Sequence, residues 1–142
     1  MQSDIEHDRI SIHSDNIALA RWLQSEIESF LYPPFADPSI PVTEATFEKW
    51  GENQAYWTES ITSEDDSIRL TWYDFAEPFM LTVAAGSVEG RPHGVYSCFI
   101  PARQAQLTLN GNVAAGQVFR QDRDGKECTT ACIAWSETWV RP

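Results

Sequence analysis

The sequence predicts an α+β fold, in which a mainly antiparallel, curved β-sheet of about six to eight strands carries one packed N-terminal amphipathic helix. Apolar residues recur every three or four positions over residues 16–31, which is typical of one helix face. From residue 54 onward, apolar and polar residues alternate, which is typical of strands. The connections between these strands are too short for crossover helices, so the sheet is expected to be antiparallel.

The helix is expected over residues 16–31. Ser14 or Asp15 offers the N-cap, and Pro33 and Pro34 end the helix because proline cannot continue the backbone ladder. The apolar face consists of Ile17, Ala20, Leu23, Ile27 and Leu31.

Two shorter elements flank this helix. Residues 9–13 alternate and predict a short strand, and residues 32–41 hold four prolines and predict a stiff loop. Residues 43–50 favour a second short helix, because Phe47 and Trp50 are three positions apart. Alternation over the same residues is a weaker argument for a strand.

The remaining strands form hairpins. Asn110-Gly111 and Asp124-Gly125 are the strongest turn signals, because a type I′ turn needs positive φ at both central residues. The expected strands are 54–62, 68–75, 79–85, 94–100, 106–109, 113–120 and 128–140. Several of them carry apolar side chains on both faces, so either the sheet curls onto itself or one face is left for a partner or ligand.

Length and composition set the class of protein. A chain of 142 residues with 42% hydrophobic residues can bury the core of one domain, and we expect a single domain over residues 1–142. The first residues are polar and contain no signal-peptide pattern, and the odd cysteine count fits a reducing compartment. We therefore expect a cytoplasmic protein.

The negative charge lies in the first half of the chain. The net charge is −11; residues 1–77 hold sixteen acidic and four basic residues, and residues 78–142 hold five and six. Such a field repels phosphates and anionic lipids and attracts cationic partners. We expect no nucleic-acid and no membrane binding.

No motif names a reaction. Known patterns for hydrolases, nucleotide binding and metalloproteases do not occur. Cys128 and Cys132 would be about 13 Å apart on a continuous strand, too far for a disulfide, so we interpret them as structural. No second Cys/His pair completes a zinc site, and we expect no metal and no cofactor. His93 lies in a loop with Arg91 and precedes Cys98, which makes these three the first candidates if the protein is an enzyme.

The most informative region combines aromatic and acidic residues. Eight of the seventeen aromatic residues lie between positions 47 and 79, together with eight acidic residues. Aromatic anchors with charged surroundings are typical of protein interfaces, and an acidic rim speeds association with a basic partner. The alternative is that the aromatics are core and the acids a solvated edge. The predicted partner-binding residues are Trp57, Glu59, Glu64, Asp65, Asp66, Trp72, Tyr73, Asp74 and Glu77.

The leading functional hypothesis is a small acidic protein-binding inhibitor, for example an immunity protein that neutralises a basic toxin. The first alternative is a small enzyme or ligand-binding domain with a pocket between the sheet and the helix near His93. The second alternative is a structural or assembly subunit of an oligomer.

Overall fold

The computed structural model describes residue 5 and residues 9–52, 54–87 and 92–140. These residues divide into two compact units, each built from three stretches of chain. Unit 1 contains Met1–Trp50, Thr58–Thr71 and Gln106–Gly116, and unit 2 contains Gly51–Trp57, Trp72–Ala105 and Gln117–Pro142. Several long strands therefore pass from one unit into the other along the chain.

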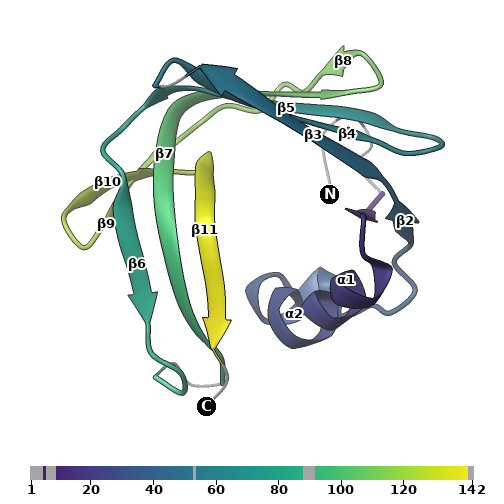
Figure 1. Ribbon diagram of the computed structural model, residues 1–142, viewed down its shortest axis with the longest axis horizontal. Coiled ribbons are helices and arrows are strands. Elements are labelled where there is room, and N and C mark those ends of the chain that lie inside the picture. The colour runs from purple at the N-terminus through teal and green to yellow at the C-terminus, as the bar shows by residue number, and fades with distance from the viewer. Residues whose placement is uncertain (1–4, 6–8, 53, 88–91, 141–142) are drawn as a thin grey trace. The chain divides into compact units, whose positions relative to one another are not determined.

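The predicted helix is present in unit 1 as three consecutive segments. An α-helix, α1 (Ile17–Leu23), continues as a π-helical segment, Gln24–Glu28, and ends as α2 (Ser29–Leu31) (Figure 1). The N-cap is Asn16, whose Oδ1 accepts a hydrogen bond from the Leu19 N–H at 3.1 Å. The predicted caps, Ser14 and Asp15, were therefore one or two residues early. Ser14 instead supports the cap, because its Oγ accepts from the Asn16 N–H at 2.9 Å.

The proline-rich loop is tied to the helix by two polar side chains. It contains a short 3₁₀ helix, Pro33–Ala36. The buried Gln24 amide donates to the Asp37 carbonyl at 2.8 Å, and Arg21 Nη1 donates to the Ile40 carbonyl at 2.9 Å. These bonds satisfy carbonyl groups in a segment that proline keeps out of regular structure.

The predicted second helix over residues 43–50 was wrong, because these residues form strands. β2 (Val42–Glu44) pairs in parallel with β1 (Ile12–Ser14), and β3 (Thr46–Glu52) joins the edge of the main sheet beside β4 (Tyr56–Thr62). Phe47 is half-buried while Trp50 is 40% exposed, so the two do not form one buried helix face.

The main sheet confirms the predicted α+β class. It has seven strands, five of them in the order β11-β7-β5-β4-β3, and β6 and β8 also pair with β7. β7 pairs antiparallel with β6, β8 and β11. In unit 2, β6 and β11 flank β7, as Figure 1 shows. The remaining bounds are β5 (Ser67–Phe75), β6 (Phe79–Val83), β7 (Gly94–Leu109), β8 (Asn112–Val113) and β11 (Cys132–Val140).

β7 is a single strand of sixteen residues where the sequence predicted two strands, 94–100 and 106–109. The expected break near Pro101 does not occur, because the groups around this proline are satisfied. The Pro101 carbonyl accepts from the Ala76 N–H at 2.8 Å, and the next N–H, that of Ala102, donates to the Ala131 carbonyl at 2.8 Å. Proline itself has no N–H to contribute to the strand pairing.

The predicted strand over residues 128–140 is divided, and the strand over 113–120 is mostly irregular. A separate two-stranded hairpin forms from β9 (Arg120–Arg123) and β10 (Lys126–Thr129). The break after Thr129 is fixed by its hydroxyl, which bonds to the carbonyls of Ala102 and Ala131 at 2.8 and 2.9 Å. Both predicted turns have the expected positive φ, 51° and 82° at Asn110-Gly111 and 55° and 77° at Asp124-Gly125.

Each unit has its own buried apolar residues. In unit 1 these are Ala20, Ile27, Ile40, Ala45, Ile68 and Leu109, and in unit 2 they are Ala76, Phe79, Ala102 and Cys128. No helix in the described part of the chain is both long and apolar enough to cross a membrane.

Candidate functional site

Unit 1 contains a cavity between its helix and its part of the sheet. The cavity has a volume of about 390 Å³. Its walls are mostly aliphatic and aromatic carbon, since Leu19, Ala20, Leu23, Phe35, Ile61, Ile68, Leu70 and Leu107 line it. A smaller set of polar residues also lines it, namely Ser11, His13, Ser14, Gln24 and Glu28. An apolar space with few polar groups is the usual composition of a small-molecule site.

His13 is the most distinctive polar residue of this cavity. Its side chain is only 4% exposed, and its Nε2 lies 3.2 Å from Ser11 Oγ and 3.6 Å from Asp66 Oδ2. Its Nδ1 is buried and has no hydrogen-bond partner among the described residues. Buried polar atoms are nearly always satisfied, so this unpartnered ring nitrogen distinguishes His13 from the other polar residues that line the cavity.

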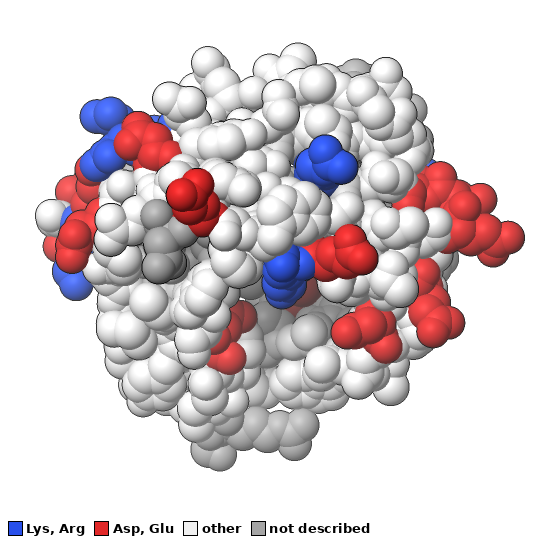
Figure 2. Space-filling model, turned by 45° about the horizontal axis from the view of Figure 1, so that its top comes forward, with Lys and Arg blue, Asp and Glu red and all other residues white. Residues whose placement is uncertain are grey.

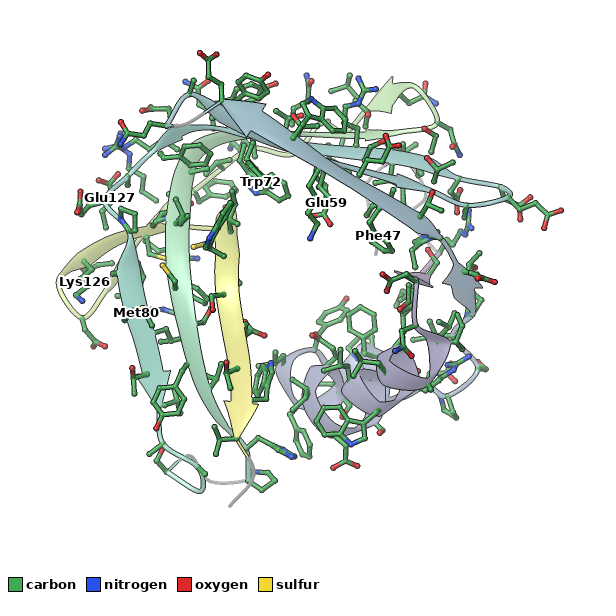
Figure 3. All side chains as sticks on the ribbon, viewed as in Figure 1. Phe47, Glu59, Trp72, Met80, Lys126 and Glu127 are labelled. Atoms are coloured by element: carbon green, nitrogen blue, oxygen red, sulfur yellow. The ribbon has the colours of Figure 1, made fainter. Side chains whose placement is uncertain are left out.

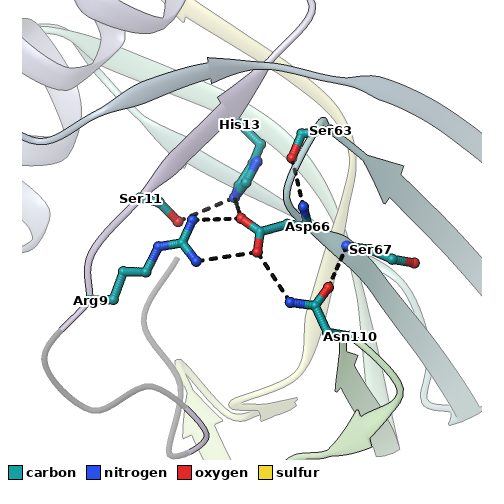
Figure 4. A network of polar contacts seen from close by, with 7 residues as sticks. All are labelled: Arg9, Ser11, His13, Ser63, Asp66, Ser67 and Asn110. Atoms are coloured by element: carbon teal, nitrogen blue, oxygen red, sulfur yellow. Dashed lines mark hydrogen bonds and ion pairs between the residues drawn. The ribbon is translucent and has the colours of Figure 1, made fainter.

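Asp66 lies next to His13 and belongs to a network of hydrogen bonds and ion pairs between residues of unit 1 that are far apart in the sequence (Figure 4). Arg9 Nη2 donates to Asp66 Oδ2 at 2.7 Å, and Arg9 Nη1 donates to Oδ1 at 3.2 Å. Asn110 Nδ2 donates to Asp66 Oδ1 at 3.3 Å, while Asn110 Oδ1 accepts from the Ser67 N–H at 2.8 Å. The Asp66 side chain is 2% exposed, so this carboxylate is satisfied inside the protein.

The protonation states of the pair follow from this environment. Burial lowers the pKa of His13, the Asp66 carboxylate opposes that effect, and the Arg9 cation adds to it, so the pKa ends below 6.5. Burial raises the pKa of Asp66, but hydrogen bonds from Arg9 and Asn110 outweigh it and bring the pKa below 3.8. At neutral pH the site therefore holds a neutral imidazole beside an ionised carboxylate.

The tautomer of His13 follows from the same geometry. Nε2 faces the Asp66 carboxylate, which attracts a proton and cannot donate one when ionised. The proton is therefore favoured on Nε2, and Nδ1 is left as a hydrogen-bond acceptor.

The predicted partner-binding residues are divided between the two units, four in unit 1 and five in unit 2. In unit 1, Glu64 and Asp65 are exposed in the turn between β4 and β5, and Asp66 is withdrawn into the network described above. Glu59 is half-buried on β4, with its carboxylate 3.3 Å from Lys49 Nζ (Figure 3).

In unit 2, the aromatic residues of this set are less exposed than the acidic ones. Trp57 and Trp72 are half-buried and Tyr73 is 36% exposed (Trp72 is labelled in Figure 3). Asp74 and Glu77 are exposed, and Arg103 Nη1 donates to Asp74 Oδ1 at 3.1 Å. Figure 2 shows Asp and Glu side chains on the visible face, with Lys and Arg side chains beside some of them.

The sequence suggested, as an alternative, a pocket between sheet and helix near His93. His93 does not line the cavity of unit 1. The cavity does lie between the helix and strands of unit 1, but the histidine that lines it is His13. His93 and Cys98 belong to unit 2, and Arg91 lies outside the described residues. In the sequence, His13 is only the last residue of the short strand expected over residues 9–13. The signal that could have found it is the two-residue spacing of Ser11 and His13, which places both on one face of an extended segment.

The cysteines are free thiols. Cys128 is buried on β10, and Cys98 and Cys132 are half-buried. The expected distance between Cys128 and Cys132 assumed one continuous strand. It does not apply, because β10 ends at Thr129 and β11 begins at Cys132. Burial, with a smaller effect of Cys128, raises the pKa of Cys132 to about 12, which leaves its thiol protonated and unreactive at neutral pH.

Within residues 9–52, 54–87 and 92–140, no group of three or more His, Cys, Asp or Glu side chains is placed to hold a metal ion. No family model, curated protein or solved structure matches the chain.

Proposed function

We propose that this protein is a binding protein whose unit 1 holds a small, uncharged, mainly apolar molecule carrying one hydroxyl or N–H group. The observation that carries the proposal is that His13, whose buried Nδ1 has no partner among the described residues, lines the 390 Å³ cavity. Small-ligand sites have volumes of about 300 to 1,000 Å³ and combine apolar walls with a few placed polar groups.

The ligand chemistry follows from the charges around the cavity. A neutral His13 with Nδ1 as acceptor calls for a donor on the ligand, and an apolar wall calls for a hydrocarbon body. Glu28 lines the cavity and the ionised Asp66 lies behind His13, so an anionic ligand is disfavoured. The hydrogen bond would satisfy a buried atom that otherwise costs free energy in the folded protein.

A pair of isomeric probes tests this proposal. Octanol and heptyl methyl ether have the same atoms, but only octanol has a hydroxyl donor. We expect octanol to bind about tenfold more tightly in ligand-observed NMR titrations, since one buried hydrogen bond is worth roughly 1.4 kcal/mol. Equal affinities for the two probes, or no binding of octanol, would contradict the proposal.

Two alanines on helix α1 supply matched variants. Ala20 is buried and lines the cavity, whereas Ala18 is exposed and does not. We expect Ala20→Phe to fill the cavity and abolish octanol binding, and Ala18→Phe to leave it unchanged. Circular dichroism of both variants separates a filled cavity from a misfolded protein.

An acidic inhibitor of a basic protein is the second candidate. The favouring observation is that Glu64 and Asp65 are exposed together in the turn between β4 and β5, in a chain of net charge −11. We expect Glu64→Gln/Asp65→Asn to slow association with a purified cationic nuclease at low salt, because rim charges act mainly on the association rate. Glu26→Gln/Glu44→Gln removes the same charge from exposed positions elsewhere and is the control. Equal association rates for the two double variants would remove the support for this candidate.

A further inference from the structure

Unit 2 contains a second cavity, which is separate from the proposed ligand site in unit 1. Its volume is about 550 Å³. The lining combines aromatic rings, aliphatic side chains and two carboxylates. It includes Tyr56, Trp57, Phe75, Trp135, Glu52 and Glu77.

Two indole rings form a corner of this cavity. The ring centroids of Trp57 and Trp135 are 4.9 Å apart and their planes meet at 74°, an edge-to-face arrangement. Trp57 is half-buried, which fixes its position, and Trp135 is 57% exposed, so the corner is reachable from solvent. An indole face is electron-rich and is the best aromatic surface for a cation.

Two negative charges lie in the lining of the same cavity. Glu52 and Glu77 both line it and are both exposed, and none of the described Lys, Arg or His residues lines it. Within the described residues, neither carboxylate has a hydrogen-bond or ion-pair partner. As far as the described residues go, the cavity therefore combines π faces and negative charge without a cation.

Other aromatic rings in the chain do carry a cation. In unit 1, Arg69 lies over the Trp50 ring at 6.0 Å. In unit 2, Arg123 lies over Phe99 at 5.8 Å and Lys126 over Phe79 at 5.5 Å. Neither Trp57 nor Trp135 has such a pair within the described part of the chain, which leaves the aromatic corner available to a cation from outside.

We propose that the unit 2 cavity binds a small organic ammonium ion, with its alkylated nitrogen against the Trp57–Trp135 corner and its charge balanced by Glu52 and Glu77. Alkylated ammonium groups suit such a site because their carbon shell contacts the rings while the positive charge interacts with the π faces. The inference does not depend on the apolar-ligand site, because the two cavities share no lining residue.

Choline and its neutral isostere 3,3-dimethylbutanol provide the test, because they differ chiefly in the charge. We expect saturation-transfer NMR to show choline binding to the wild-type protein about tenfold more tightly than dimethylbutanol. Equal affinities would overturn the proposal and leave a merely apolar cavity. A trimethyllysine peptide that binds when choline does not would also overturn it, because the occupant would then be a protein side chain.

Variants at exposed positions locate the site without endangering the core. We expect Trp135→Leu and Glu77→Gln each to weaken choline binding by about five- to tenfold. Glu48→Gln, which removes the same charge from an exposed position of unit 1, is expected to have no effect. Unchanged choline affinity in Trp135→Leu and Glu77→Gln would contradict the assignment.

The cavity-filling variant Ala20→Phe separates the two proposals. It belongs to unit 1 and should abolish octanol binding while leaving choline binding intact. Loss of choline binding in this folded variant would contradict the unit 2 assignment, whatever the result with octanol.

Discussion

Arg9 donates two hydrogen bonds to the buried carboxylate of Asp66, at 3.2 and 2.7 Å, across 57 positions of sequence. The pair joins the segment before β1 to the turn between β4 and β5, and Asp66 is 2% exposed while Arg9 is 39% exposed. Removing the carboxylate leaves the guanidinium and the Asn110 amide without their common acceptor, and it removes the negative charge 3.6 Å from His13 Nε2. We expect Asp66→Ala to lower the free energy of unfolding by about 3 kcal/mol, measured by urea denaturation.

The neighbouring acid is a matched control for that variant. Asp65 is exposed and differs from Asp66 by one position. Asp65→Ala should change the free energy of unfolding by no more than about 0.5 kcal/mol, as is usual for surface positions. If the two variants lose the same stability, the Asp66 network does not stabilise unit 1 as its geometry indicates.

His13 predicts a pH dependence of stability with a definite sign. The fold holds its pKa below 6.5, so the unfolded chain binds the proton more readily than the folded protein does. Stability from this residue is therefore complete above pH about 6.5 and decreases as the pH falls below it. We expect His13→Asn to flatten the dependence of the unfolding free energy between pH about 7.5 and about 5.5. If the unfolding free energy of His13→Asn depends on pH as steeply as that of the wild type, another group causes the loss of stability at low pH.

The elements predicted correctly from the sequence are those that local chemistry determines. The helix follows from apolar spacing, and Asn110-Gly111 and Asp124-Gly125 follow from the need for positive φ. Residues 43–50 were not predicted correctly because their local pattern supports either structure. Their state is decided by pairing with β1 and by their place in the main sheet, which a local pattern does not contain.

A pocket between helix and sheet was only an alternative hypothesis from the sequence, and it was placed near His93, whereas the histidine that lines the unit 1 cavity is His13. Asp66 stands in a run of three acids, Glu64-Asp65-Asp66, and nothing local distinguishes it from its neighbours. Arg9 and Asn110 select it, and both are more than forty positions away. Long-range partners of this kind decide which carboxylate is buried, so single-residue roles were less predictable than strands.

A buried hydroxyl pair gives a prediction about coupling. Thr58 Oγ1 and Thr71 Oγ1 lie 3.1 Å apart, and both residues are buried in unit 1. Thr71→Val leaves the Thr58 hydroxyl without its partner and should cost about 1 to 2 kcal/mol in urea denaturation. Thr58→Val/Thr71→Val replaces both polar groups and should be close to wild type. If the single costs simply add in the double variant, the two hydroxyls are not coupled.

Two exposed glycines of unit 1 test whether a glycine is needed for its backbone conformation or can be replaced by alanine without strain. Gly111 has φ of +82° in the turn between β7 and β8, and Gly116 lies outside the positive-φ region; neither has an atom within 4 Å of where a Cβ would stand. Space is therefore equal at the two sites and only the backbone conformation differs. We expect Gly111→Ala to lower the free energy of unfolding by about 1 kcal/mol, because an L-residue is strained there. Gly116→Ala should be neutral or should raise that free energy by about 0.5 kcal/mol, since alanine reduces the entropy of the unfolded chain. Equal effects of the two variants in urea denaturation would contradict the left-handed geometry of the Asn110-Gly111 turn.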